Sequence, residues 1–157
     1  MTVQTETRVA GPFSGYGVTT ALPFDFVVFE AADLIVIERD DTTGDDTVLV
    51  LTTDYSVTLN PSQDDDPGGT ITLVAPLPSG STDFVYSNVA ALQEAIFTNT
   101  GGFYPAVLNT ALDKLTVLVQ QVKEAQARSV LAPVGETAGL DLPPTPQRAG
   151  LYLAFDA

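Results

Sequence analysis

Apolar and polar residues alternate in short runs over the first hundred residues, and turn-forming residues separate the runs. Runs of this length and spacing, rich in Val, Ile, Thr, Phe and Tyr, are typical of strands in a small antiparallel sandwich or barrel. Helical patterns between the runs are absent, which counts against a doubly wound α/β fold. The strand candidates are residues 16–29 (broken by Pro23), 34–38, 47–51, 55–59, 70–74 and 83–87.

The aromatic and aliphatic residues of these runs are more simply a hydrophobic core than a platform for a ligand, because 45% of the chain is apolar. The predicted core residues are Phe24, Phe26, Leu34, Val36, Tyr55, Val57, Ile71 and Leu73. The expected fold is therefore mainly β, a small antiparallel sandwich-like domain.

One long helical pattern follows the strands, over residues 105–131. Pro105 suits the first helical turn, where a missing N–H costs nothing, and Pro133 prevents further extension. Within the helix, apolar residues repeat with the spacing of heptad a and d positions, and further apolar residues widen the stripe. The stripe consists of Leu108, Ala111, Leu112, Leu115, Leu118, Val119, Val122 and Ala125. Its width indicates a three-stranded bundle or a helix that also packs on its own sheet; a single amphipathic helix covering one sheet edge remains open.

The composition divides the chain into four segments. We expect a flexible N-terminal arm at 1–14, a β-rich domain at 15–104, the helix at 105–131, and an extended linker at 132–157 that is rich in Pro, Gly and Thr. The apolar run at 151–155 suggests that the polypeptide continues into a longer protein.

The charge balance restricts the partners. Twenty acidic residues against six basic ones give a net charge of −14, which repels nucleic acids and anionic lipid and suits a partner with a basic patch. The chain has no His and no Cys, so the common metal ligands, the usual proton shuttle and thiolate nucleophiles are missing. We therefore expect no cofactor, no metal and no catalytic residues. We also expect no membrane span, because no apolar run approaches the ~18 residues that a span needs.

The acidic run Asp64–Asp66 is the most tempting metal site. A calcium loop needs acids at alternating positions, a glycine and a distal Glu, whereas these acids are adjacent and Pro67 follows them. A solvated turn is the preferred interpretation. A glycosidase that uses two carboxylates is the weakest alternative, because the chain has no His, no Cys and no nucleophile motif.

Several segments in order resemble a known family. They are GVTTALPFDF (17–26), DYSV (54–57), GGTITL (68–73), GFYPA (102–106) and ALDKL (111–115). Their order is similar to that of the N-terminal domain of T7-like podophage tail fibres and tailspikes.

The resemblance implies a structural protein of the virion tail, with no enzymatic activity. Such domains attach a trimeric receptor-binding fibre or spike to tail tube, adaptor or nozzle proteins, and the helix would form a parallel homotrimer. The apolar stripe would then be the trimer interface. The alternatives are a carbohydrate-binding module and a stand-alone adaptor for a separate spike.

Overall fold

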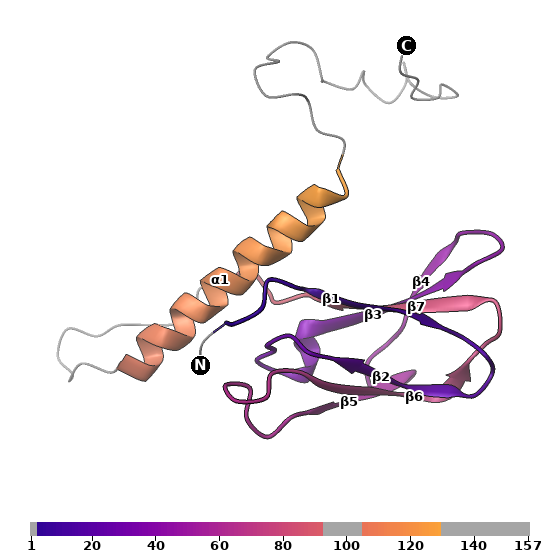
Figure 1. Ribbon diagram of the computed structural model, residues 1–157, viewed down its shortest axis with the longest axis horizontal. Helices are drawn as coiled ribbons and strands as arrows, with labels where there is room; N and C mark the ends of the chain where they lie inside the picture. Colours follow the sequence, from indigo (N-terminus) through magenta and orange to yellow (C-terminus); the bar gives the residue numbers. More distant parts are fainter. Residues whose placement is uncertain (1–2, 93–104, 130–157) are drawn as a thin grey trace, which may run out of the picture. The chain divides into compact units, whose positions relative to one another are not determined.

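A computed structural model of the protein describes residues 3–92 and 105–129. Two antiparallel sheets lie face to face, as Figure 1 shows. The first sheet, sheet A, has the strand order β1 (Val9–Ser14), β7 (Ser81–Ser87), β3 (Leu34–Asp40) and β4 (Asp46–Val48). The second, sheet B, has the order β2 (Thr19–Phe24), β6 (Gly69–Leu77) and β5 (Tyr55–Leu59). A 3-10 turn (Ala31–Asp33) precedes β3, and one helix, α1, spans Pro105–Ala127.

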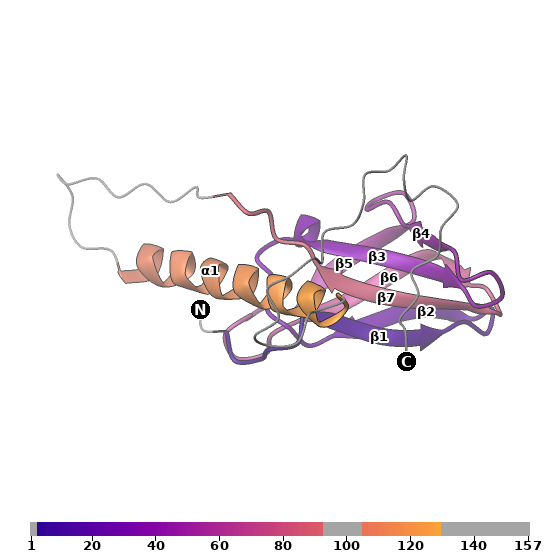
Figure 2. The same ribbon diagram turned by 90° about the horizontal axis from the view of Figure 1, so that it is seen from above.

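The strand pairing explains why the two sheets form a sandwich. β7 pairs along its length with β3, from Leu34↔Ser87 to Asp40↔Ser81, and β1 covers its other edge; Figure 2 shows β1, β7, β3 and β4 side by side in this order. In β7 the residues Ser81, Asp83 and Val85 alternate towards the buried face, as the two-residue period of a strand requires. The predicted antiparallel sandwich with one long helix is confirmed for the described residues, whereas the trimeric bundle and the linker stay predictions.

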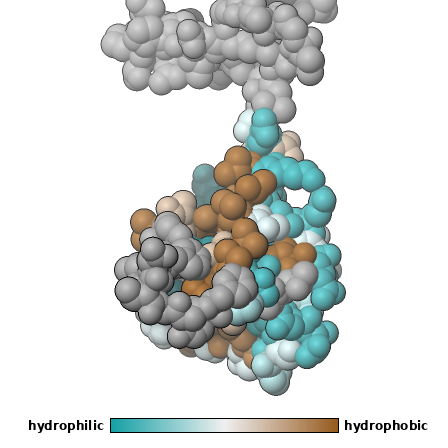
Figure 3. Space-filling view, turned by 90° about the vertical axis from the view of Figure 1, so that its left-hand side faces the viewer, coloured by the Kyte–Doolittle hydropathy of each residue, from teal (hydrophilic) through white to brown (hydrophobic). Residues whose placement is uncertain are grey.

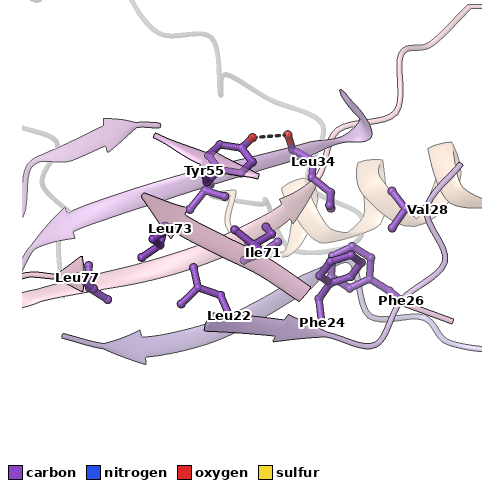
Figure 4. Packing of buried hydrophobic residues seen from close by; sticks show 11 residues of the cluster. Leu22, Phe24, Phe26, Val28, Leu34, Tyr55, Ile71, Leu73 and Leu77 are labelled. Carbon is purple, nitrogen blue, oxygen red and sulfur yellow. Dashed lines mark hydrogen bonds between the residues drawn. The ribbon is translucent and has the colours of Figure 1, made fainter. Parts of the chain in front are cut away.

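The core lies between the two sheets. Seven of the eight predicted core residues are buried; Val57, on the edge strand β5, is half-buried and packs against the others. Figure 4 shows side chains of this cluster converging between the strands, among them Leu22, Val28 and Leu77, which the prediction did not include. The Tyr55 hydroxyl donates a hydrogen bond of 3.1 Å to the Leu34 carbonyl, which ties sheet B to sheet A across this core.

The strand boundaries largely follow the predicted runs. β5 coincides with the predicted 55–59 run, and Pro23 is tolerated within β2 because β2 is an edge strand of sheet B. The run at 47–51 forms only the short strand Asp46–Val48. After it the chain turns, because the Asp54 carboxylate accepts a 2.7 Å hydrogen bond from the Val50 N–H.

The N-terminal segment differs from the prediction of a flexible arm at 1–14. Residues Val9–Ser14 form β1 and pair antiparallel with β7, with a register shift between Ala10 and Phe13. Arg8, just before the strand, is 2% exposed and donates to the Val27 carbonyl at 2.9 Å. The open edge of β7 supplies the pairing partner, and a local pattern in residues 1–14 does not reveal it.

The other segments of the prediction are placed as follows. α1 ends at Ala127, close to the expected end of the helix at 131. The expected linker at 132–157 lies outside the described residues, as do residues 93–104 of the expected β-rich segment. Among the described residues, no helix has the length and apolar character needed to cross a membrane.

Candidate functional site

Helix α1 forms for local reasons that the sequence shows clearly. It is 23 residues long, begins at Pro105 and contains no glycine. Two threonine hydroxyls within it form hydrogen bonds inside the helix: Thr110 and Thr116 donate to the backbone carbonyls four residues earlier, at 3.0 and 2.9 Å. The other side chains of the helix that matter for the site lie on two separate faces.

One face of α1 packs against the β-rich part of the chain. Val117 is 0% exposed and is the one buried residue of the helix. Gln121 lies one turn further on, and its amide oxygen accepts from the Val89 N–H and the Ser87 hydroxyl, both at 2.8 Å. Its amide nitrogen donates to the Val89 carbonyl at 3.2 Å, so the side chain pairs with the backbone that leaves β7. This face is thus fixed by one buried apolar side chain and one amide.

The N-terminal segment makes further contacts with the same helix. Gln120 donates to the Thr5 carbonyl at 3.0 Å, and the Lys123 ammonium lies 2.7 Å from the Glu6 carboxylate. The hydrogen bond and the charge of Lys123 lower the pKa of Glu6. Both partners of this ion pair are largely exposed, so it contributes little to stability.

A continuous apolar stripe lies on the opposite face of α1. Its members have exposed fractions between 37% and 67% and are spaced alternately four and three residues apart: Leu108, Leu112, Leu115, Val119 and Val122. At roughly 100° per residue around a helix axis, these positions lie about 140–220° from Val117. Figure 3 shows hydrophobic residues gathered in a band on this side of the molecule. Below, "exposed stripe" refers to these five residues.

The structure divides the predicted trimer-interface residues into two groups. The five residues of the exposed stripe point away from the β-rich part. Ala111 and Leu118 are half-buried, and Ala125, on the same flank of the helix, is exposed. The alternating four–three spacing of the exposed stripe is itself a heptad a/d spacing, in a register that places Leu112 and Val119 on the seam instead of Ala111 and Leu118. Sequence alone could not choose between the two registers, because the choice depends on which face the sandwich covers.

The predicted solvated turn at Asp64–Asp66 is a turn in the structure, and all three residues are exposed. The Gln63 side chain holds the loop: its amide oxygen accepts from Val28 N–H at 3.2 Å and Gly68 N–H at 3.0 Å. Within residues 3–92 and 105–129, no group of three or more acidic side chains is arranged to hold a metal ion.

A cavity of about 240 Å³ opens between β3, β6 and the turn before β5. Leu49, Leu73 and Val74 contribute to its apolar walls, and its ionisable groups are Glu38 and Asp54. One Asp54 oxygen accepts a 2.7 Å hydrogen bond from the Val50 N–H.

Three buried ionisable residues, Arg8, Asp33 and Asp83, escaped the sequence analysis. Arg8 stacks over the Phe26 ring at 5.5 Å, and burial lowers its pKa to about 10, so it remains charged at neutral pH. Asp83 is fully buried in β7. The sequence shows Asp83 only as a charged residue at the start of the predicted 83–87 strand, and such a position does not tell whether the carboxyl is buried or exposed.

Comparison with known proteins finds a similarity to a phage tail protein. No family model matches it. Over 123 residues it is 37% identical to the tail spike protein of Salmonella phage epsilon15. The chain is related to a phage tailspike. The match covers 78% of the chain but only 11% of that tailspike, so the relative is a far longer protein. The relationship to tailspikes agrees with the predicted resemblance at this general level; the narrower T7-like assignment stays a prediction.

Proposed function

We propose that this chain is the virion-anchoring part of a phage tailspike or tail fibre, and that three copies associate through helix α1. The related tail spike protein supports a structural role in the phage tail. The observation that carries the proposal is the exposed stripe, which lies opposite the face that holds α1 against the sandwich.

The apolar surface of the stripe requires a partner. Five large apolar side chains in one row form the kind of contiguous patch that marks an interaction surface. The four–three spacing is that of a coiled-coil seam, which makes another copy of the same helix the natural partner. Because Val117 and Gln121 hold the other face, each helix can enter such a bundle while it keeps its own sandwich.

The width of the apolar surface favours three strands over two. Beside the exposed stripe, Ala111 and Leu118 remain half-buried rather than covered. A two-stranded seam needs only two lines of apolar residues, so this third line would be left over in a dimer. In a three-stranded bundle it lies at the flank of the seam.

The sandwich would then face the tail. Acidic residues dominate the chain, and the β3–β4 hairpin alone exposes Asp40, Asp41, Asp45 and Asp46. Three copies multiply this negative charge, which favours a basic docking surface on a tail tube, adaptor or nozzle protein and disfavours nucleic acid. The proposal assigns no catalytic activity and no cofactor to this chain.

Two experiments test the proposal separately. Light scattering of residues 1–157 should give the mass of a trimer, and a monomer at all concentrations would refute association through α1. Particles prepared without spikes should bind the chain, and saturating amounts of it should block later addition of full-length spike. Failure to compete would refute the anchoring role and leave the trimer intact.

A further inference from the structure

Asp83 is buried in a place where no cation or hydrogen-bond donor meets it. Its side chain is 0% exposed and points into the space between the sheets from β7. Neither carboxyl oxygen has a hydrogen-bond partner among the described residues. An ionised carboxylate in such surroundings is strongly disfavoured, and the usual response is that the group takes up a proton.

The neighbour across the sheet makes ionisation still harder. Glu38 of β3 stands directly opposite Asp83 in the antiparallel register, so both acids lie on the inner face of sheet A. Like charges directly opposite on neighbouring strands repel each other. Glu38 also lines the cavity of about 240 Å³, which gives it contact with solvent that Asp83 lacks.

The elements around Asp83 present no basic side chain that could pair with its carboxylate. On its other side Asp83 faces Phe13 of β1, and that strand has no ionisable residue. Across the core, the strands of sheet B contribute only Tyr55, whose hydroxyl already donates to Leu34. Arg39 follows Glu38 on β3 and is paired outside the core with Asp46 at 2.7 Å.

We propose that Asp83, with Glu38 beside it, is a buried proton-binding site that makes the stability of the sandwich depend on pH near neutrality. Burial first, and the charge of Glu38 second, raise the pKa of Asp83 from 3.8 to about 7. The folded chain therefore binds a proton between about pH 4 and pH 7 that the unfolded chain has released. Stability from this group is greatest below about pH 4, falls as the pH rises from about 4 to 7, and changes little above pH 7.

The size of the effect follows from the two pKa values. Between pH 5 and pH 8 the Asp83 contribution to the folding equilibrium constant should fall by tens-fold, and by roughly a hundredfold at most. The rest of the acidic chain also repels itself more strongly as pH rises, so the effect of Asp83 must be read as a difference between variants.

The test compares unfolding of the unmodified chain and Asp83→Asn by denaturant at pH 5 and pH 8. Asp83→Asn should remove a tenfold or larger part of the pH dependence and should be the more stable protein at pH 8. The control Asp25→Asn removes one charge from an exposed position and should keep the full pH dependence. A difference between Asp83→Asn and the unmodified chain of less than threefold would overturn the proposal.

A second measurement covers the case in which Asp83→Asn does not fold. Carbon-13 NMR of the unmodified chain should show the Asp83 carboxyl titrating near pH 7, and a midpoint below 5 would overturn the proposal. Glu38→Gln should move that midpoint downwards. Stabilisation at pH 8 by 5 mM CaCl₂ or MgCl₂, with a shift of the Asp83 signal, would show a divalent cation site instead and would also overturn it. The NMR midpoints do not depend on trimer formation, whereas the unfolding comparison is made at one fixed chain concentration, because unfolding of a trimer depends on concentration.

Discussion

Replacing two residues of the exposed stripe should separate the chains without unfolding them. Leu115 and Val119 are 58% and 60% exposed in the single chain, so Leu115→Gln/Val119→Gln removes little that the monomer already buries. In the proposed bundle both side chains become buried. Full burial of such a side chain is worth about 1.5–3 kcal/mol, and the remaining exposed part accounts for about 1–2 kcal/mol at each position.

The loss is multiplied because three chains carry both changes. Six sites give about 6–12 kcal/mol per trimer, which corresponds to roughly 10⁴–10⁹ in the trimerisation constant. Since the concentration at half-dissociation scales with the square root of that constant, it should rise by about a hundredfold or more. A trimer at micromolar concentration should become a monomer.

The assay is analytical ultracentrifugation across a concentration series, together with thermal unfolding of the variants. Val74→Gln is the matched control: it is the same change at an exposed valine of β6, 71% exposed, away from the helix. The control should stay trimeric. If the stripe variant remains a trimer at the concentrations at which the unmodified chain does, the seam lies elsewhere and the assignment of the exposed stripe is wrong.

Two further predictions concern the fold that presents the stripe. Gly68→Ala should cost more than about 2 kcal/mol of unfolding free energy in urea, because Gly68 has a φ of +107° and an added Cβ would meet the Phe24 carbonyl oxygen. Gly44→Ala is its control: φ is also positive but the space around it is open, so it should cost only about 1 kcal/mol, and equal losses would show that the close approach is unimportant. Val117→Ala should cost about 1–3 kcal/mol and lower the hydrogen-exchange protection of α1, while β7 amides keep theirs. Unchanged exchange in α1 would mean that Val117 does not hold the helix.

Much of the β-rich part could be predicted because its information is local. The strand β5 and the inward residues Leu34, Val36, Ile71 and Leu73 follow from short runs of alternating or apolar residues between turn residues. The start of α1 at Pro105 follows equally from local chemistry. In each case a side chain's neighbours along the chain were enough to determine its environment.

What the sequence by itself determined is therefore the set of elements and the presence of an apolar surface on the helix. Only the tertiary structure decided which way that surface turns. Val117 faces the sandwich because Gln121 pairs with the backbone after β7, and this contact leaves the five residues of the exposed stripe on the far side. The same holds for β1, Arg8 and Asp83, whose environments depend on strands far away in the sequence. Sheet pairing and burial depend on contacts between segments that are distant in the sequence, so a local sequence pattern does not predict them.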